Sequence, residues 1–392
     1  MGYPGTDVTE PVARDFYHDG MDSSLRLDRH RCAKVVRSSN PKKEESKMKD
    51  TLIAVDLAKT VFEIAVSEHP GKVAEQHRLS RDKFLGFFAG RQPSTVLLEA
   101  CGSAHYWARA LQRLGHRPVL LPPQLVRPYI PRNKTDRADT KGLLEASRNE
   151  KIKPVPVKSE SQQTLGALHR LRSRWMADRI ARLNTLRGLL REFGFFIPVG
   201  ASRVVPAILA WIEDAESGLM DALREPLAEA CAEIRELERR ILGIERQLKA
   251  LARQTPVVKR LQSIPGVGLL TSTALVAFVG DVQRFPSSRH FSSFLGLTPR
   301  EYSTGNRRRL GRISKRGDAY LRMLLIHGAR AVLWAAKRQQ KPPDRLRDWA
   351  LRCEFRRGHN KAAVALANKL ARLVWAIWRR GTQYQAQPLT NV

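Results

Sequence analysis

The sequence predicts an α/β domain followed by a long helical region, and three observations lead to that prediction. Short apolar runs alternate with helical stretches between residues 51 and 121. From residue 161 onward, apolar residues recur at steps of three and four, the spacing of amphipathic helices. A Thr-Pro pair at 255–256 then interrupts that spacing, and a different helical unit begins. We therefore expect an α/β domain at 50–158, a helical spacer at 159–255 and a mainly α C-terminal domain at 256–392.

Two strands of the expected α/β domain each end in a carboxylate. The apolar run 51–56 ends at Asp56, and the run 94–99 ends at Glu99. The runs 51–56 and 61–66 are separated only by a short polar break, which is typical of adjacent antiparallel strands. A carboxylate on a buried strand is costly unless it is paired or bound to a metal ion. Asp56 and Glu99 are therefore candidate metal ligands.

A second pair of carboxylates lies where strands give way to helix, in the stretch Asn133-Lys134-Thr135-Asp136-Arg137-Ala138-Asp139-Thr140. In a helix, Asp136 and Asp139 lie one turn apart on the same face. That arrangement suits the oxygen ligands of a hard divalent cation. The same residues also fit a capping box, with Asp136 as the N-cap and Asp139 at the third helical position. The two interpretations are compatible.

The charge of the chain favours a nucleic-acid partner. Its 69 Lys and Arg residues exceed its 38 Asp and Glu residues, giving a formal net charge of +31. Such an excess attracts polyanions, and each neutralised phosphate releases counterions.

The four cysteines are scattered without a CxxC pair, which argues for a reducing compartment and against a structural zinc site. No apolar run long enough for a membrane span and no secretory signal is present, so we expect a cytoplasmic, nucleoid-associated protein.

Residues 1–49 have a polar, unpatterned sequence that predicts a disordered leader. An early start codon, with Met48 as the natural beginning, is the alternative.

The spacer that follows the α/β domain combines an arginine-lined helix with a seam of apolar residues typical of a coiled coil. The arginines suggest a face that tracks phosphates. The seam is formed by Ile234, Leu237, Ile241, Ile244, Leu248 and Leu251.

The C-terminal region carries two candidate nucleic-acid contacts. Residues 261–268 resemble a helix-hairpin-helix, in which Gly266 and Gly268 would present backbone N–H groups to a phosphate. A tight turn that holds two helices together is the alternative. Further along, a dense set of cations could clamp a DNA or RNA backbone, in preference to forming a solvated face. This set comprises Arg307, Arg308, Arg309, Arg312, Lys315 and Arg316.

Taken in order, the four acids resemble the DEDD set of a RuvC-like, RNase H-type nuclease core. The sequence around each of these acids is similar to that of the insertion-sequence one-ten family of DEDD transposases. Val55-Asp56-Leu57-Ala58-Lys59 resembles the first acid motif of that family, and Glu99-Ala100-Cys101-Gly102 the second. Asn133-Lys134-Thr135-Asp136-Arg137-Ala138-Asp139 resembles the third. The resemblance covers about residues 50–380 and includes the C-terminal transposase domain.

The resemblance implies a recombinase that moves its own element by cutting and joining double-stranded DNA at the element ends and the target. Asp56, Glu99, Asp136 and Asp139 would hold two Mg²⁺ ions. Lys59 and Lys134 lie near these acids in the sequence and could contact the scissile phosphate, with solvated lysines as the alternative. A serine after the family's Gly-Leu-Thr-Pro motif would attack the phosphate. A gapless reading puts that position on Thr304, and a shift of one residue puts it on Ser303, which we favour. A Ser-Thr-Gly turn without chemistry is the alternative.

The same resemblance implies two further partners. A structured bridge RNA from the element would pair with donor and target DNA and supply the sequence specificity. The protein would assemble as a homo-oligomer, a dimer or tetramer. The seam of the spacer could pair within the chain or with another protomer, and because the family forms multimers we favour the second. Two other functions remain open: a RuvC-like nuclease or junction resolvase without a covalent intermediate, and a non-catalytic nucleic-acid-binding protein.

Overall fold

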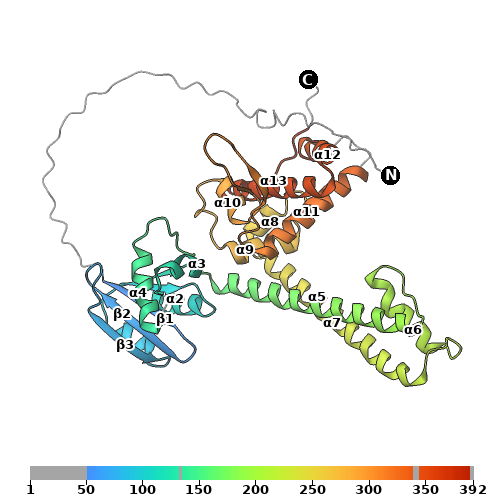
Figure 1. Cartoon of the computed structure of the whole chain (residues 1–392), viewed down its shortest axis with the longest axis horizontal. Helices are drawn as coiled ribbons and strands as arrows, with labels where there is room; N and C mark the ends of the chain where they lie inside the picture. The colour runs from blue at the N-terminus through green and yellow to red at the C-terminus, as the bar shows by residue number, and fades with distance from the viewer. Residues whose placement is uncertain (1–50, 132–134, 339–343, 389–392) are drawn as a thin grey trace, which may run out of the picture. The chain divides into compact units, whose positions relative to one another are not determined.

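The computed structural model describes residues 51–131, 135–338 and 344–388 (Figure 1). The expected leader at 1–49 and the predicted phosphate contact Lys134 lie outside these described residues. The backbone of Asp136 is described, but its side chain is not.

The α/β part is a mixed five-stranded sheet in the order β3-β2-β1-β4-β5. β1 (Leu52–Leu57), β2 (Val61–Ser67) and β3 (Glu75–Ser80) pair in antiparallel fashion, as expected for the first two. β4 (Thr95–Glu99) and β5 (Arg117–Leu121) run parallel to β1. This order, in which the antiparallel strands β1, β2 and β3 are joined through β1 to the parallel strands β4 and β5, is consistent with the RNase H-like fold that the motifs suggested.

The two faces of the sheet pack against different helices. On one face, Phe62 of β2 meets α1 (Phe84–Ala89) and α2 (Ala104–Arg113) in an aromatic core. On the other face, Ala54 and Leu97 pack against α4 (Asp136–Ser147). The short helices α3 (Pro123–Val126) and η1 (Arg127–Tyr129) precede α4. Because strand side chains alternate between faces, these two cores fix the side of the sheet to which every strand residue points.

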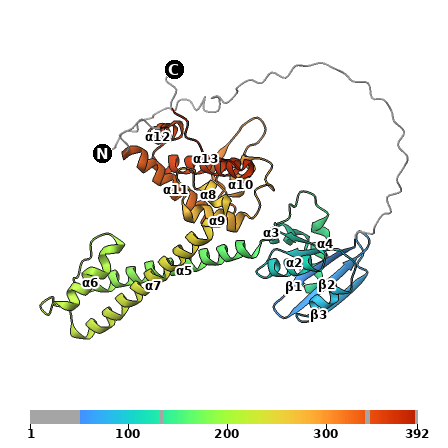
Figure 2. The ribbon, with the colours of Figure 1, turned by 180° about the vertical axis from the view of Figure 1, so that it is seen from behind.

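The spacer consists of two helices of 33 residues, α5 (Glu160–Glu192) and α7 (Asp221–Arg253), which run side by side in Figures 1 and 2. η2 (Ala201–Arg203) and α6 (Val204–Glu213) connect them. A capping box of Ser159 and Gln162 starts α5. Arg172 binds Glu245 and Arg182 binds Glu233, so rising numbers on one helix meet falling numbers on the other, and the pair is antiparallel.

This pairing corrects one expectation and bears on another. The α7 seam is buried within the chain, with Ile241 only 6% exposed, so the expectation that another protomer covers it is wrong. Arg172, Arg179 and Arg182 of α5 form ion pairs with carboxylates of α7, so these three link the two helices. Each of these guanidinium groups is positioned by a glutamate of the partner helix, which a sequence pattern on one helix alone does not reveal. A phosphate-tracking face on the other arginines of α5 stays a prediction.

The C-terminal region is mainly helical, as expected, and surrounds one core that includes Phe291, Leu325 and Leu366. Its helices are α8 (Pro256–Leu261), α9 (Leu269–Val279), α10 (Ser288–Phe294), α11 (Ala319–Arg338), α12 (Arg345–Arg357) and α13 (His359–Arg380). Between α10 and α11, β6 (Pro299–Glu301) and β7 (Leu310–Ile313) form an antiparallel hairpin that the sequence did not predict. This hairpin carries the candidate nucleophile.

Candidate active site

Asp56 and Glu99 lie at the carboxyl ends of adjacent parallel strands. Val55 of β1 is in register with Leu98 of β4, so Asp56 and Glu99 are the next residues along the two strands. Ala54 and Leu97, two residues earlier, face α4. Because side chains alternate along a strand, Asp56 and Glu99 point to that same face. Both are partly buried. The fold therefore places the first two predicted acids side by side.

A third carboxylate, Glu63, which the sequence motifs missed, lies beside Asp56 on the neighbouring strand. Glu99, Asp56 and Glu63 thus form a row of three acids across the sheet, called the acid row below. Glu63 of β2 is directly opposite Asp56 across the antiparallel pair and so shares its face. Arg78 of β3 lies opposite Glu63, and its Nε is 3.5 Å from a Glu63 carboxylate oxygen. The signal was available in the sequence, because Glu63 interrupts the apolar run of the second strand. The outer end of the acid row is thus paired with a cation.

α4, the helix in which the second pair of predicted acids lies, packs on the same face of the sheet. Asp139 is in the first turns of this helix and is only 7% exposed. The expected cap is corrected: Thr135, not Asp136, is the N-cap, because its extended backbone lets its hydroxyl accept from the Ala138 N–H at 3.2 Å. The helix therefore begins at Asp136, and Asp136 and Asp139 remain three residues apart on one helix.

The donor set suits a hard divalent cation, since carboxylate oxygens are the ligands that Mg²⁺ prefers. Carboxylates on neighbouring strands repel one another, and a cation between them lowers that repulsion. Among the residues that the structure describes, no group of three or more His, Cys, Asp or Glu side chains is arranged to hold a metal ion. The Asp136 side chain, a member of the predicted set, lies outside the described part. Asp56, Glu99, Asp136 and Asp139 thus remain predicted ligands.

The candidate nucleophiles lie at the tip of the β6–β7 hairpin. The Ser303 hydroxyl donates to Glu301 Oε1 at 2.7 Å and accepts from the Arg309 N–H at 3.2 Å. Thr304 pairs through its backbone with Arg307, around a two-residue turn that starts at Gly305. Gly305 has a φ of +54°, as a glycine at the first position of a type II′ turn requires. The expected Ser-Thr-Gly turn is present, but its serine also has a specific carboxylate partner.

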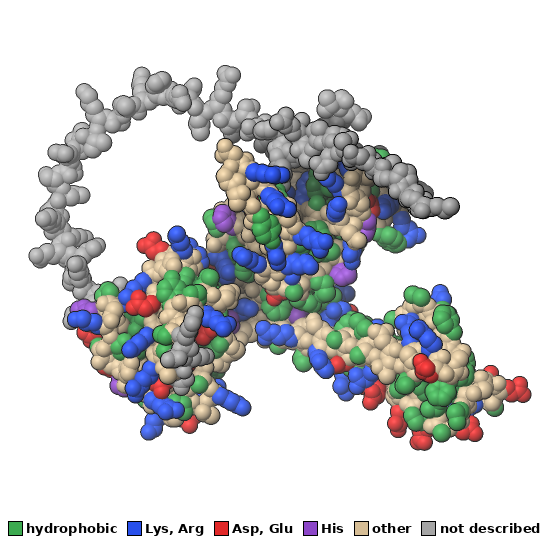
Figure 3. All heavy atoms as spheres, in the orientation of Figure 1, with side chains coloured by type: hydrophobic (Ala, Val, Ile, Leu, Met, Phe, Trp, Pro, Cys, Tyr) green, Lys and Arg blue, Asp and Glu red, His purple; other side chains and the backbone are tan. Residues whose placement is uncertain are grey.

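All six predicted cations of this region are exposed, and their loop is anchored. After β7, the Ser314 N–H donates to the Thr298 carbonyl and the Lys315 N–H to the Gly296 carbonyl. A Cβ at Gly296 or Gly317 would collide with backbone atoms across this contact. Figure 3 shows Lys and Arg side chains gathered over the C-terminal region. The exposed set comprises Arg307, Arg308, Arg309, Arg312, Lys315 and Arg316.

The predicted hairpin of residues 261–268 connects α8 to α9, but the structure gives one of its glycines a packing role. Gly266 has a φ of +78°, and a Cβ there would lie 2.6 Å from the Gly328 carbonyl oxygen of α11. The close approach is mutual, because a Cβ at Gly328 would collide with the Gly266 carbonyl. Gly268 is the exposed N-cap of α9. Phosphate binding by Gly266 and Gly268 stays a prediction, and the turn itself also packs closely against α11 at Gly328.

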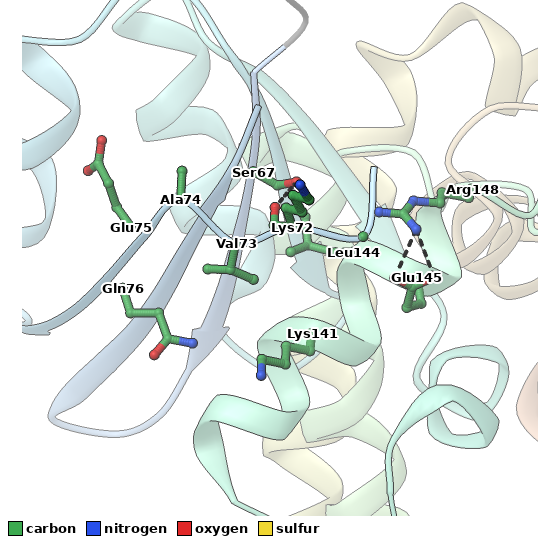
Figure 4. Close-up of a pocket in the computed structure, with 11 residues that line it drawn as sticks. Ser67, Lys72, Val73, Ala74, Glu75, Gln76, Lys141, Leu144, Glu145 and Arg148 are labelled. Atoms are coloured by element: carbon green, nitrogen blue, oxygen red, sulfur yellow. Dashed lines mark hydrogen bonds and ion pairs between the residues drawn. The ribbon is translucent and has the colours of Figure 1, made fainter. Parts of the chain in front are cut away.

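One hollow of 620 Å³ lies between the β2–β3 connection and α4, lined by residues that include Ser67, Lys141 and Arg148 (Figure 4). Arg148 forms an ion pair with Glu145 at its rim. Ser67 is in register with Leu52, at the end of β1 opposite to Asp56. The hollow is therefore separate from the acid row, and we assign it no part in the chemistry.

The mixed α/β sheet with carboxylates at its strand ends is consistent with the class of protein that the motifs indicated, the RNase H-like nucleic-acid-processing enzymes. Two family models match the chain. Residues 53–195 match the DEDD transposase model of the IS110 group, and residues 258–342 match the model described as the transposase IS116/IS110/IS902 family. The matches cover the α/β domain with α5 and much of the C-terminal region.

Curated relatives agree over almost their whole lengths. The transposase for insertion sequence element IS1111A of Coxiella burnetii is 38% identical, covering 88% of this chain and 94% of the relative. The transposase for IS1328 of Yersinia enterocolitica is 36% identical, covering 85% of this chain and 98% of the relative. A Pseudomonas aeruginosa protein described as a "Probable family 20 transposase" is 41% identical, with coverages of 85% and 98%. The chain belongs to the IS110 family of insertion-sequence transposases.

Membership confirms the resemblance that the sequence motifs indicated, and it makes DNA the substrate class. None of the described helices is long and apolar enough to span a membrane.

Proposed function

We propose that this transposase cleaves and rejoins DNA strands in a metal-dependent reaction, with a RuvC-like, RNase H-like domain at residues 50–158 as its nuclease core. The observation that supports this most directly is the shared face: Asp56 and Glu99 follow residues that pair in register, and α4, which carries Asp139, packs on that face. The proposed ligands are Asp56, Glu99, Asp136 and Asp139, binding two Mg²⁺ ions. Bound there, the ions would stabilise charge on the attacking and leaving oxygens of the phosphate.

The residues of the chain supply the rest of the chemistry. Ser303 attacks the phosphorus and forms a covalent link to DNA, as the family resemblance implies. We assign this role to Ser303 and not Thr304 because the Ser303 hydroxyl has both a carboxylate acceptor and a backbone donor. The exposed Arg307, Arg308 and Arg309 bind the phosphates that flank the scissile bond, since guanidinium groups form paired hydrogen bonds with phosphate oxygens.

The remaining parts of the proposal concern partners. The net charge of +31 supports binding of both DNA and a structured bridge RNA. Gly268 at the start of α9, together with Lys315 and Arg316, would contact backbone phosphates without reading sequence. The protein would work as a dimer or tetramer, through a surface other than the α7 seam.

The metal proposal is tested by Asp139→Asn and Asp56→Asn, with Glu145→Gln as the matched control. Glu145 is on α4 like Asp139, but it is exposed and paired with Arg148. We expect each Asn variant to lower cleavage of a supercoiled plasmid carrying the element ends by at least about 100-fold, because altering even the partners of metal ligands costs about 10–100-fold. The rise in melting temperature on adding Mg²⁺ should also be lost in both. Unchanged cleavage in both variants would refute the proposed metal ligands, whereas no cleavage by the wild type would favour a non-catalytic DNA-binding protein.

The covalent step is tested by Ser303→Ala and Thr304→Ala. We expect a protein–DNA adduct on a denaturing gel for the wild type and for Thr304→Ala, and none for Ser303→Ala. An adduct lost only in Thr304→Ala would move the nucleophile by one residue. Cleavage without an adduct in any of the three proteins would instead indicate a nuclease or junction resolvase that uses water.

A further inference from the structure

We propose that Glu301 is the general base of the covalent step, taking the proton from the Ser303 hydroxyl as that oxygen attacks phosphorus. The inference rests on the proposed role of Ser303 and adds a residue that neither the acid motifs nor the family matches assign. It starts from one contact: the Ser303 hydroxyl donates its hydrogen to Glu301 Oε1 at 2.7 Å. A base must be within hydrogen-bond reach of the proton that it removes, about 2.6–3.2 Å.

The backbone of the hairpin produces this contact. Glu301 is the last residue of β6 and is in register with Leu310 of β7. Just beyond it, the Tyr302 N–H donates to the Arg309 carbonyl at 2.9 Å, which continues the pairing toward the turn. In extended chain, residues two apart point to the same side, so Glu301 and Ser303 project together. The tight turn at Gly305 then closes the hairpin.

The second contact of Ser303 leaves its oxygen able to attack. A hydroxyl has one hydrogen to donate and two lone pairs. The hydrogen goes to Glu301, and one lone pair accepts from the Arg309 N–H at 3.2 Å. The other lone pair remains for phosphorus. Thr304 instead contributes backbone atoms to its pair with Arg307. This difference is the physical reason that Ser303 is the better nucleophile of the two.

Arg308 completes the arrangement. Its Nε lies 3.4 Å from the Glu301 oxygen that accepts from Ser303. A cation there holds the carboxylate in place and provides positive charge where the phosphate must approach. All of these side chains are exposed, so a DNA backbone can reach the hydroxyl directly.

The proposed step is balanced. As the bond from Ser303 Oγ to phosphorus forms, the bond from phosphorus to a sugar oxygen of the leaving strand breaks. The Ser303 proton moves to Glu301, and the leaving sugar oxygen takes a proton from water. In rejoining, a DNA hydroxyl attacks the phosphoserine and gives its proton to the solvent, and Glu301 returns its own proton to Ser303 Oγ as that oxygen leaves. The carboxylate thus serves as a base in one direction and an acid in the other.

A carboxylate that only stabilises the hairpin would make the same hydrogen bond, so the test variant must preserve that bond. Glu301→Gln does so, because its amide oxygen still accepts from Ser303 but takes up no proton. Asp281→Asn is the matched control: Asp281 is also exposed, in the same region, and its loss changes the net charge equally. Glu301→Asp keeps the carboxylate on a shorter side chain.

The measurement is the rate of adduct formation by the full-length protein on a supercoiled plasmid carrying the element ends, with RNA transcribed from the sequence flanking the gene. General bases typically contribute about 10²–10⁴-fold. We expect Glu301→Gln to lower the rate about 100-fold or more, Glu301→Asp to lower it less, and Asp281→Asn to leave it unchanged. DNA affinity and melting temperature should change little in Glu301→Gln.

The pH profile separates a base from a structural residue. With the base removed, hydroxide takes over, so the Glu301→Gln rate should rise about tenfold per pH unit from 6.5 to 8.5, while the wild-type rate stays nearly flat. Adduct formation within about threefold of wild type, with a flat profile, overturns the role of Glu301 while leaving the nucleophile intact. If Ser303→Ala still forms the adduct, the proposed nucleophile fails and the inference falls with it.

Discussion

Lowering the pH should destabilise this protein in part through one buried histidine of the C-terminal core, His169. Its ring lies in the core where α5 meets α9 and α11, with 0% of its surface exposed. One ring nitrogen is 3.0 Å from the Tyr320 hydroxyl, and the other is 2.9 Å from Thr273 Oγ1. Burial, with a smaller contribution from Arg172, lowers the pKa of His169 from 6.5 to about 4. The ring is therefore neutral in the folded state at neutral pH.

The sign and size of the effect follow from that pKa. Between pH 6.5 and 4 the unfolded chain binds a proton at His169 that the folded chain does not, so stability falls as the pH falls. The contribution is fully present above pH 6.5 and is lost toward pH 4. With about 1.36 kcal/mol per pKa unit, lowering the pH from 7.5 to 5 should cost about 2 kcal/mol at this site.

Urea unfolding at pH 7.5 and pH 5 measures this effect, in wild type and in His169→Gln. The variant should be less stable at pH 7.5, because it loses a buried hydrogen bond, but its stability should fall by about 2 kcal/mol less between the two pH values. His105, whose pKa is also lowered to about 4 by burial, titrates in both proteins and cancels in the comparison. His327→Gln, at an exposed position of α11, is the control. An equal pH dependence in His169→Gln and wild type would refute the reasoning.

Two further predictions concern packing. Ile241→Ala should lower the free energy of unfolding by about 2–4 kcal/mol, whereas Leu242→Ala, at the adjacent position that is 58% exposed, should change it by less than about 0.5 kcal/mol. Dissociation of an oligomer by Ile241→Ala without loss of stability would contradict the internal seam. Gly328→Ala should lower the melting temperature, because its Cβ would collide with the Gly266 carbonyl, while Gly243→Ala, in open space on α7, should stabilise by about 0.5–1 kcal/mol. Equal melting temperatures for the two alanine variants would argue against the close approach.

The strands could be predicted where burial leaves a compositional trace. β1, β2, β4 and β5 contain apolar runs, and all four were found at their expected places. β3 has the sequence EQHRLS at the edge of the sheet, and alternate residues are exposed, so it has no apolar run to detect. The coiled-coil seam was also recognised, but a heptad pattern states only that a face must be covered. Whether α5 or another chain covers it depends on the connection through α6.

In the candidate site too, some features could be predicted from the sequence and others depend on the folded backbone. The positions of Asp56 and Glu99 at strand ends followed from local sequence, and their shared face follows from the register of β1 and β4. The cap at Thr135 was missed because threonine and aspartate are both good N-caps, and only the backbone angles decide between them. The contact of Glu301 with Ser303 depends on a hairpin whose strands are three and four residues long, too short to leave a periodic signal.

The four proposed ligands belong to two separate elements, which gives ion binding a mechanical consequence. Asp56 and Glu99 are part of the sheet, whereas Asp136 and Asp139 belong to α4, which packs on the sheet through apolar side chains. An ion bound by both pairs of carboxylates would link α4 to the sheet. By mass action, the binding free energy would add to the stability of that contact. Gly142 of α4, where a Cβ would lie 2.6 Å from Ile130, lets the segment before α4 pack closely on this helix. Because α4 carries two of the proposed ligands, replacing Gly142 by alanine should weaken ion binding without changing a ligand.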